Sequence, residues 1–330
     1  MSQAFESFVE IYPDALQARI EARDRFLRNL PPDIGGNPLE FVFDSARRWN
    51  PGQSLRVGFR GGSDELYQEI AAVADEWSNH GNITFDFKDD DTGEFRTWSE
   101  NDKEYLGDIR ISFSFPGYWS MVGTDSIDLS IAPPNESSMN FGGFTRSLPD
   151  GWQATVLHEF GHALGFQHEH QSPIGGCDLD FRWEDDPGYL RTTDPFGQFV
   201  ADAQGRRPGI YTVLGGPPNN WPEAKVNHNL RQLRNSHAFM IGPFDRTSIM
   251  KYAFPEWMFR DGANSHCFGT RNRELSTQDK AGIARAYPHD EESARNEAGR
   301  RRDALEGLVN AASLDSLSKE HFQAQLEGLG

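Results

Sequence analysis

The spacing of three histidines constrains this chain more than any other feature of its sequence. His158, His162 and His168 stand in the segment HEFGHALGFQH. On an α-helix, residues four apart lie on one face, so His158 and His162 can direct ring nitrogens at a single ion. Gly165 can adopt a left-handed conformation that ends the helix and turns the chain, which lets His168 approach from another direction. Because a catalytic zinc ion takes three protein ligands and keeps a fourth position for water, the segment predicts a zinc site.

Glu159 is the residue of this segment best placed to act as a general base. It follows the first histidine directly, which rotates its carboxylate off the metal-facing side but leaves it near the open coordination position. Zinc lowers the pKa of its water to about 7, and a nearby carboxylate can take the proton as the water attacks a carbonyl. The same carboxylate can deliver that proton to the leaving amine. The segment therefore predicts hydrolysis of peptide bonds without a covalent intermediate on the enzyme. The competing interpretation is a chance run of structural histidines on an amphipathic helix.

Charge and composition exclude several other classes of function. Acidic residues outnumber basic ones by 50 to 32 and the formal net charge is -18, so nucleic acid is not expected as a partner. No apolar run approaches the length of a membrane span. The first residues lack the basic end and apolar stretch of a Sec signal, which leaves a cytoplasmic location or export by a signal-independent route. The sequence does not indicate an oligomeric state.

The cysteine count limits the role of disulfides. Only Cys177 and Cys267 occur, so a disulfide framework does not hold this fold together. A single bridge remains open, because sequence cannot show whether the two α-carbons come within bridging distance.

Alternating apolar residues predict the strands of a twisted sheet. We expect strands at residues 55–59, 83–87, 109–115 and 126–132. The last of these is interpreted as an edge strand, because Pro133 and Pro134 end it.

Helical spacing of apolar residues predicts the helices that pack on this sheet. They are expected over residues 14–30, 63–79, 150–164 and 276–286, with a helical pair in 291–330. Ser63, Asp150 and Ser276 are the expected N-terminal caps, the last as part of a capping box. Little regular structure is expected over residues 171–246, which are rich in Gly, Pro, Asn and Asp.

These elements divide the chain into three expected segments. Residues 1–49 form an N-terminal helical extension that is either a propeptide-like latency segment or a docked structural extension. Residues 50–290 form the catalytic domain, and residues 291–330 form a C-terminal helical appendage.

The histidine segment resembles the signature HExxHxxGxxH of the metzincin metallopeptidases at every fixed position. It is most similar to the longer astacin form, HExxHxxGFxHE, because Phe166 and Glu169 are also in place. The segment SIMKY at residues 248–252 resembles the astacin Met-turn. By this resemblance Met250 would form the hydrophobic floor under the histidines, and Tyr252 would be the phenol that approaches zinc and stabilises the oxyanion.

Other parts of the chain match the astacins less well. Residues 108–144 look more like the corresponding part of matrixins, and by analogy with the clan the strand at 126–132 would bind substrate as an added antiparallel strand. In astacins the glutamate after the third histidine pairs with the amino terminus left by propeptide removal. No processing site is recognisable here, so Glu169 is expected to have another partner. Asp44 faintly resembles the propeptide aspartate that blocks zinc, although the glycine of that pattern is absent.

The resemblance implies an α+β, metzincin-type zincin domain. It would have a mainly parallel sheet with an antiparallel edge strand, an active-site helix and an irregular lower subdomain, and it would hold one catalytic Zn²⁺. The implied function is a zinc endopeptidase acting on protein or peptide substrates. One alternative is a catalytically silent binding protein with a zinc scaffold, which has no physical need for Glu159 or Tyr252. Another is a zinc amidase acting on cell-wall peptides.

Overall fold

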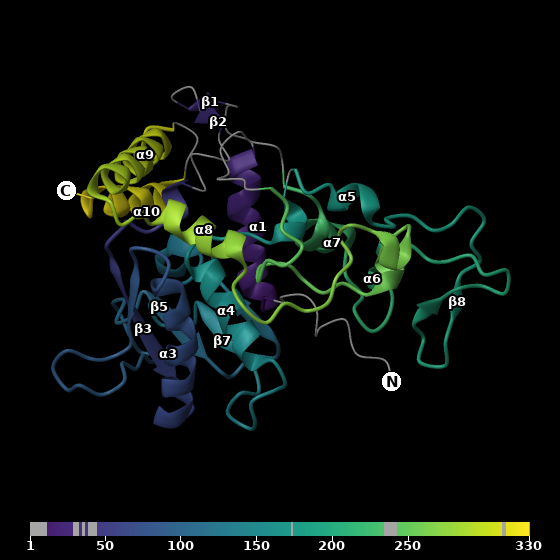
Figure 1. Ribbon diagram of the computed structural model, residues 1–330, viewed down its shortest axis with the longest axis horizontal. Helices are drawn as coiled ribbons and strands as arrows, with labels where there is room; N and C mark the ends of the chain where they lie inside the picture. Colours follow the sequence, from purple (N-terminus) through teal and green to yellow (C-terminus); the bar gives the residue numbers. More distant parts are fainter. Residues whose placement is uncertain are drawn as a thin grey trace. The chain divides into compact units, whose positions relative to one another are not determined.

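Two units make up the fold in the computed structural model (Figure 1). The sheet unit comprises the described parts of residues 11–167 and 273–330, and the loop unit comprises those of residues 168–235 and 243–272. The structure describes residues 12–28, 33–34, 37–38, 45–172, 174–233, 243–311 and 315–329. Asp44 lies outside the described residues.

A five-stranded sheet forms the framework of the sheet unit, in the order β4-β3-β5-β7-β6. Strands β4, β3, β5 and β7 run parallel, and β6 pairs antiparallel with β7. The strands are β3 (Ser54–Arg60), β4 (Thr84–Asp86), β5 (Ile109–Ser112), β6 (Tyr118–Ser120) and β7 (Met139–Phe141). This confirms the predicted α+β fold with a mainly parallel sheet and an antiparallel edge strand.

Helices α3 (Asp64–Ser78) and α4 (Trp152–Ala163) contact each other, and α3 also contacts β4. Ser63 caps α3 as predicted, because its hydroxyl accepts a hydrogen bond from the Leu66 amide at 3.4 Å. The ring of Phe160 on α4 packs edge-on against Phe85 of β4, with centroids 4.9 Å apart. An aromatic core therefore lies between the sheet and α4, the helix that carries His158 and His162.

The predicted cap of α4 is wrong. Asp150 does not cap the helix; the N-cap residue is Gly151, with φ 69°, and it makes no side-chain cap bond. The Asp150 carboxylate instead accepts from the Arg273 guanidinium at 2.7 Å. The helix therefore begins one residue later than the sequence predicts, and Asp150 forms an exposed ion pair with a distant arginine.

The edge strand predicted at residues 126–132 is also wrong. This stretch holds the end of a 3-10 helix, η2 (Gly123–Ile127), followed by a turn. The amides of Ile131 and Ala132 both bond to the Asp128 carbonyl, at 3.0 and 2.8 Å, so they curl back on their own chain and pair with no strand. The antiparallel edge of the sheet is β6. The alternation of SIDLSIA does not follow burial, because Asp128 is buried whereas Leu129 is 51% exposed.

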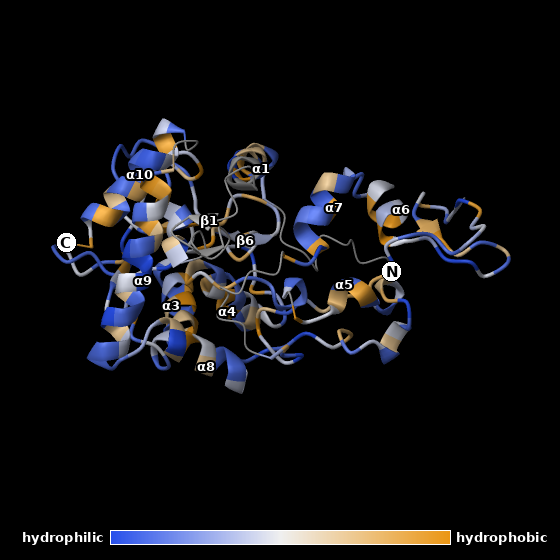
Figure 2. Ribbon diagram, turned by 90° about the horizontal axis from the view of Figure 1, so that it is seen from above, coloured by the Kyte–Doolittle hydropathy of each residue, from blue (hydrophilic) through white to orange (hydrophobic). Residues whose placement is uncertain are grey.

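The C-terminal part of the sheet unit is helical, as predicted. Its helices are α8 (Thr277–Ala286), α9 (Glu291–Val309) and α10 (Ser316–Glu327). Both bonds of the capping box between Ser276 and Asp279 are present. Figure 2 shows hydrophobic and hydrophilic residues on both α9 and α10. Leu305 and Leu308 of α9 pack in one buried cluster with Phe322 of α10 and with Ala46.

Helix α1 (Asp14–Arg28) packs on the segment that follows β6 in the chain. Its buried Leu16 and Ile20 contact a cluster that includes Trp119 and Ile131. The chain before the sheet also contains β1 (Asp33–Ile34) and β2 (Asn37–Pro38), which pair antiparallel. Helix α1 thus adds a layer of buried side chains to the sheet unit.

The loop unit contains only short elements, as the sequence predicts. They are η3 (Glu169–Gln171), α5 (Cys177–Asp180), β8 (Thr192–Thr193), β9 (Phe199–Val200), α6 (Ile210–Gly215), α7 (Glu223–Leu230), η4 (Glu256–Met258) and η5 (Gly262–Asn264). A disulfide joins Cys177 and Cys267, whose α-carbons are 5.6 Å apart. This settles the bridge that the sequence left open. The rings of Phe181 and Phe259 stack nearby, with centroids 5.2 Å apart.

Among the described residues, none of the helices combines the length and the apolar character that crossing a membrane requires.

Asp125 ties α1 to the sheet unit through a buried ion pair. Its two carboxylate oxygens accept from the Arg23 guanidinium at 2.6 and 2.8 Å, and Arg47 lies 3.1 Å away. Burial alone would raise the pKa of Asp125, but Arg23 and Arg47 more than offset this effect and hold the pKa below its usual value. The charged carboxylate therefore stabilises the fold above the pKa of about 3.9 that an unfolded chain has.

We expect Asp125→Asn to lower the free energy of unfolding by about 3–5 kcal/mol at neutral pH, because it leaves buried arginines without their partner. Urea denaturation measures this loss. Since the pKa is depressed in the folded state, the difference between variant and parent should shrink as the pH falls below about 4. Glu136→Gln is the matched control, because Glu136 pairs with Arg19 of the same helix at a site where its side chain is 43% exposed. The control should change stability by no more than about 1 kcal/mol.

Candidate active site

The C-terminal end of α4 is closed by the glycine that the sequence predicts. Gly165 has φ 93°, and its amide donates to the His162 carbonyl at 2.8 Å. The amide of the next residue, Phe166, donates to the Gly161 carbonyl at 3.0 Å. These two bonds define a Schellman motif, which requires a left-handed residue at this position. The helix therefore ends at Ala163, one residue after His162, and the chain changes direction before His168.

Side chains from distant segments hold the carbonyl groups of α4. The indole of Trp77 donates to the Leu157 carbonyl at 2.9 Å, and that of Trp49 donates to the Ala163 carbonyl at 2.8 Å. The phenol of Tyr287 donates to the Leu164 carbonyl at 2.7 Å. Because the last carbonyls of a helix have no partner within it, Trp49 and Tyr287 fix the helix end, while Trp77 holds the middle of the helix.

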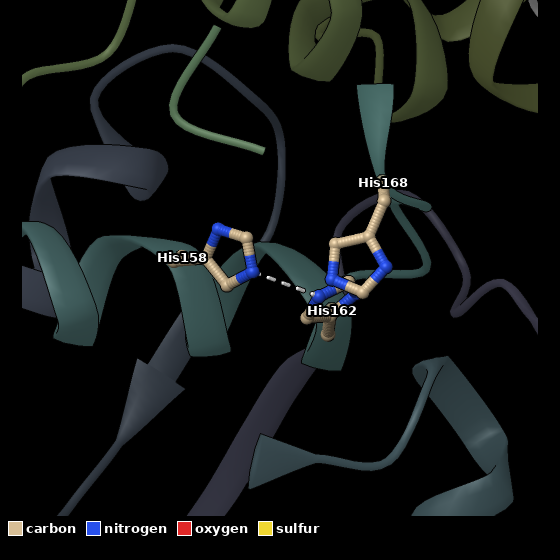
Figure 3. Close-up of side chains that lie close together, drawn as sticks. All are labelled: His158, His162 and His168. Carbon is tan, nitrogen blue, oxygen red and sulfur yellow. Dashed lines mark hydrogen bonds between the residues drawn. The ribbon is translucent and has the colours of Figure 1, made fainter. Parts of the chain in front are cut away.

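The two histidines of α4 point ring nitrogens at each other. The Nε2 atoms of His158 and His162 lie 3.2 Å apart, and the ring of His162 is almost fully buried (Figure 3). The other nitrogen of His162, Nδ1, lies 2.8 Å from the Phe166 carbonyl oxygen. A carbonyl can only accept, so Nδ1 carries the proton and Nε2 keeps its lone pair for a metal.

His168 completes the group. One ring nitrogen of each of the three histidines lies within 4.8 Å of the others, as the motif predicts (Figure 3). The Nδ1 atom of His168 lies 3.3 Å from the Gln171 side-chain oxygen. The amide nitrogen of Gln171 donates in turn to the His228 carbonyl at 2.9 Å. This chain of contacts orients the His168 ring, and spacing alone does not reveal it.

The donor set fits zinc. Two nitrogens bound to a tetrahedral zinc ion, each about 2.0 Å from it, are about 3.3 Å apart, which matches the separation between His158 and His162. Imidazole nitrogens are borderline ligands that suit zinc, and hydrogen bonds to the opposite ring nitrogens are typical of histidines that bind metals. Glu159 lies beside the first ligand and is 2% exposed.

The turn at residues 248–252 is built around a buried methionine. The Met250 amide donates to the Ser248 hydroxyl at 3.0 Å, and the Met250 side chain is 3% exposed. The Met250 carbonyl accepts from the amide of Glu169, the residue after His168, at 3.0 Å. The turn and the third histidine are therefore coupled through the backbone.

Tyr252 packs its ring on His168, with centroids 4.2 Å apart. It also lies near the buried His170, whose Nε2 is 3.0 Å from the Asn229 carbonyl oxygen. Glu169, expected to have a partner other than an amino terminus, accepts from the Asp245 amide at 2.7 Å. The loop unit thus places Tyr252 directly against a proposed metal ligand.

Lys251 is a neighbour of the site that sequence reasoning missed. Burial and the nearby Arg246 together lower the pKa of its amino group to about 8, while Glu169 acts in the opposite direction. Its Nζ atom donates to the Tyr252 carbonyl at 3.0 Å. A lysine inside the Met-turn carries no sequence signal for burial, since lysine is usually exposed.

Comparison with solved structures places this chain in a known family. A structure of myroilysin is 30% identical in sequence, with a TM-score of 0.54, and the match covers 74% of this chain and 97% of that chain. The chain belongs to the astacin-like family of metzincin zinc metalloproteases. A second myroilysin structure is 28% identical, with a TM-score of 0.46 over 74% of this chain and 86% of that one.

A further similar structure comes from an animal. High choriolytic enzyme 1, a hatching enzyme zinc-protease from Oryzias latipes (medaka fish), is 18% identical with a TM-score of 0.40, and the match covers 73% of this chain and 94% of that chain. No family model matches the chain, and no curated protein matches it either.

We expect His162→Ala to abolish stoichiometric zinc binding, because two imidazoles alone cannot hold a catalytic zinc ion tightly. Zinc content per chain after dialysis, measured by atomic emission, tests this. His289→Ala is the control, since His289 is exposed and lies outside the motif, and it should retain the zinc of the parent protein. Equal zinc in both variants would show that the metal binds elsewhere.

Proposed function

We propose that the chain is a zinc endopeptidase that hydrolyses peptide bonds within proteins, with one catalytic ion on His158, His162 and His168. The observation that carries this proposal is the convergence of three imidazole nitrogens within 4.8 Å of one another. When bound, zinc supplies the Lewis acid that polarises the scissile carbonyl and lowers the pKa of a water molecule. The membership of the family supports a protein or peptide as the substrate.

Glu159 is the proposed general base. It is the residue next to His158 on α4, and its side chain is 2% exposed. A carboxylate shielded from bulk water exchanges protons with groups in the site more readily than with solvent. We infer that Glu159 accepts the proton of the attacking water and returns it to the leaving amine.

Tyr252 is the proposed donor to the oxyanion. Its ring lies against His168, and its backbone is fixed in the turn that also buries Met250. A phenol hydroxyl held at the edge of the site can donate a hydrogen bond to the oxygen on which charge develops. Met250 and Gly165 support the site without touching substrate, the first by apolar packing and the second by ending α4.

Two alternative functions are less well supported by the site than an endopeptidase. A silent zinc scaffold would need the three histidines but has no use for a buried glutamate beside the metal position. A zinc amidase acting on cell-wall peptides would use the same residues on a different amide. Hydrolysis of unfolded protein compared with that of peptidoglycan fragments distinguishes the two enzymes.

We also propose that residues 50–290 form the catalytic domain, with 1–49 and 291–330 as extensions. Contacts within the sheet unit support a structural role for both extensions. Arg48 pairs with Glu297 of α9 at 3.2 Å, and Arg301 donates to the Asn50 side chain at 2.7 Å. The C-terminal helices thus clamp the chain where the domain begins.

We expect Glu159→Gln to bind zinc like the parent protein but to lower kcat by about 10²–10⁴, because the amide cannot accept the proton. Cleavage of casein and of a peptide library, read by mass spectrometry with and without a chelator, measures this loss. Chelated parent protein should be inactive and should recover on addition of zinc. Undiminished turnover by the variant would rule out Glu159 as the base.

Tyr252→Phe should lower kcat by about 10²–10³ with little change in KM, because one hydrogen-bond donor to the transition state is removed. Tyr189→Phe is the control, since the Tyr189 hydroxyl donates to the Val200 carbonyl in the β8–β9 hairpin. Steady-state kinetics on one quenched peptide compare the two variants. If Tyr252→Phe raised KM alone, its hydroxyl would serve substrate binding instead.

A further inference from the structure

A second group of metal-ligating side chains surrounds the disulfide of the loop unit. The Sγ atoms of Cys177 and Cys267 and a ring nitrogen of His266 lie within 4.8 Å of one another. The two cysteines are buried, whereas the His266 side chain is 53% exposed. None of these residues belongs to the histidine motif or to the Met-turn.

One distance in this group matches a tetrahedral metal site, and the two sulfurs, bonded to each other here, would have to separate. His266 Nε2 lies 3.3 Å from Cys267 Sγ. A zinc ion with Zn–S of about 2.3 Å and Zn–N of about 2.0 Å places sulfur and nitrogen ligands about 3.5 Å apart. The α-carbons of the cysteines are 5.6 Å apart, so rotation about the Cα–Cβ bonds can separate two reduced sulfurs without moving the backbone.

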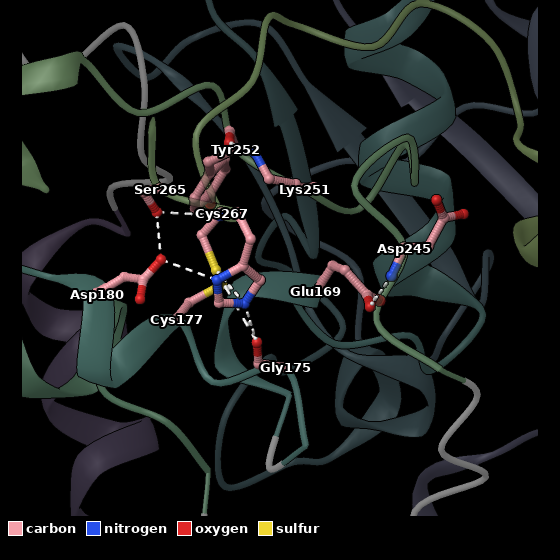
Figure 4. The surroundings of a disulfide bond; sticks show 10 residues. Glu169, Gly175, Cys177, Asp180, Asp245, Lys251, Tyr252, Ser265 and Cys267 are labelled. Carbon is pink, nitrogen blue, oxygen red and sulfur yellow. Dashed lines mark hydrogen bonds and ion pairs between the residues drawn. A yellow bond between two sulfur atoms is a disulfide. The ribbon is translucent and has the colours of Figure 1, made fainter. Parts of the chain in front are cut away.

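The imidazole already has the hydrogen bond that metal-binding histidines make. Its Nδ1 atom lies 2.9 Å from the Asp180 carboxylate, and that carboxylate also accepts from the Ser265 hydroxyl (Figure 4). A carboxylate behind the ring is a partner typical of metal-binding histidines, and a metal would take Nε2, the nitrogen on the opposite side of the ring. A disulfide that only cross-links the chain does not need a histidine that contacts both an aspartate and one of the sulfurs.

We propose that the reduced pair of Cys177 and Cys267, together with His266, forms a second metal site for a thiophilic divalent cation such as Zn²⁺. A phosphine reductant supplies two electrons and becomes the phosphine oxide, while water supplies the oxide oxygen and two protons, so the S–S bond is replaced by two thiols. Binding then releases one proton from each thiol and forms two metal–sulfur bonds and one metal–nitrogen bond. Thiolate and imidazole ligands select zinc over calcium or magnesium, which prefer oxygen.

The site competes with one existing contact. In the disulfide form His266 Nε2 donates to the Gly175 carbonyl oxygen at 2.6 Å, so a metal ion would have to replace this hydrogen bond. The same carbonyl oxygen is 4.0 Å from Cys267 Sγ, so it stands at the edge of the group and can serve as a fourth ligand or hold a water. The exposed edge of His266 gives an ion its path to the buried sulfurs.

The metal would substitute for the disulfide as a cross-link. The bridge joins residues 90 positions apart and closes the loop unit between α5 and the segment after η5. A metal bound by both sulfurs closes the same loop, so the loop unit keeps its fold in an oxidising or a reducing environment. The chain is thereby stabilised by either of two chemistries at one position.

Cobalt titration of the full chain tests this proposal. Two samples of metal-free protein are prepared: one is oxidised, and the other is reduced with a phosphine under anaerobic conditions and desalted. Each sample is titrated with Co²⁺, and binding is followed by absorption. We expect the oxidised chain to bind one ion, at the three histidines, and to show no thiolate charge-transfer band. The reduced chain should bind two ions and show that band in the near ultraviolet. Zn²⁺ should bleach the band and raise the thermal midpoint of the reduced chain more than that of the oxidised chain.

Variants assign the ligands. Asp180→Asn should weaken binding at the second site about 10–100-fold, and Asp261→Asn, an exposed control, should not. His266→Ala should bind still more weakly, whereas His289→Ala should match the parent. Circular dichroism of the reduced chain with and without Zn²⁺ separates unfolding from loss of the site. A reduced chain that stays folded without the band, or that unfolds and is not restored by Zn²⁺, overturns the proposal.

Discussion

The end of α4 is the constraint on which the rest of this structure depends. Two ligands of the proposed zinc site lie on this helix, and the third follows only because the helix stops at Ala163. Gly165 makes the stop possible, since its positive φ closes the Schellman motif and any other residue would be strained there. Trp49, Trp77 and Tyr287 then hold the helix carbonyls from three separate parts of the sheet unit.

The loop unit solves a different physical problem, because it has little regular structure to fix its side chains. Its order comes from side-chain to backbone hydrogen bonds, from an aromatic cluster around Phe181 and Phe259, and from one disulfide. These contacts position Tyr252 and Met250 beside the segment that begins with His168. An irregular chain can thus hold functional side chains firmly when its backbone polar groups are paired.

Buried charge gives the sheet unit its specific connections. Arg23, Arg47 and Asp125 join α1, the chain before β3 and the η2 turn in one buried group. A buried charge needs an oppositely charged partner, so the fold must bring Arg23, Arg47 and Asp125 together although they are far apart in the sequence. The same need explains why residues 126–132 form a turn and no strand, since Asp125 and Asp128 face inward and their neighbours pair locally.

The sequence by itself determined the features that arise from local rules. The glycine that ends α4, the caps at Ser63 and Ser276, and the positions of most strands follow from periodicities and preferences within about ten residues. The convergence of the three histidines could be predicted for the same reason, because they lie on one helix and the turn that follows it.

Tertiary structure alone decided the features that depend on distant partners. Asp150 pairs with Arg273, which is 123 positions away in the chain. Gln171 contacts the ring of His168, and Lys251 is buried with its amino group on the Tyr252 carbonyl. The pairing of Cys177 with Cys267 belongs here too, since 90 positions of chain separate them. No local pattern encodes these contacts, because each one exists only once the fold has brought its two halves within a few ångströms.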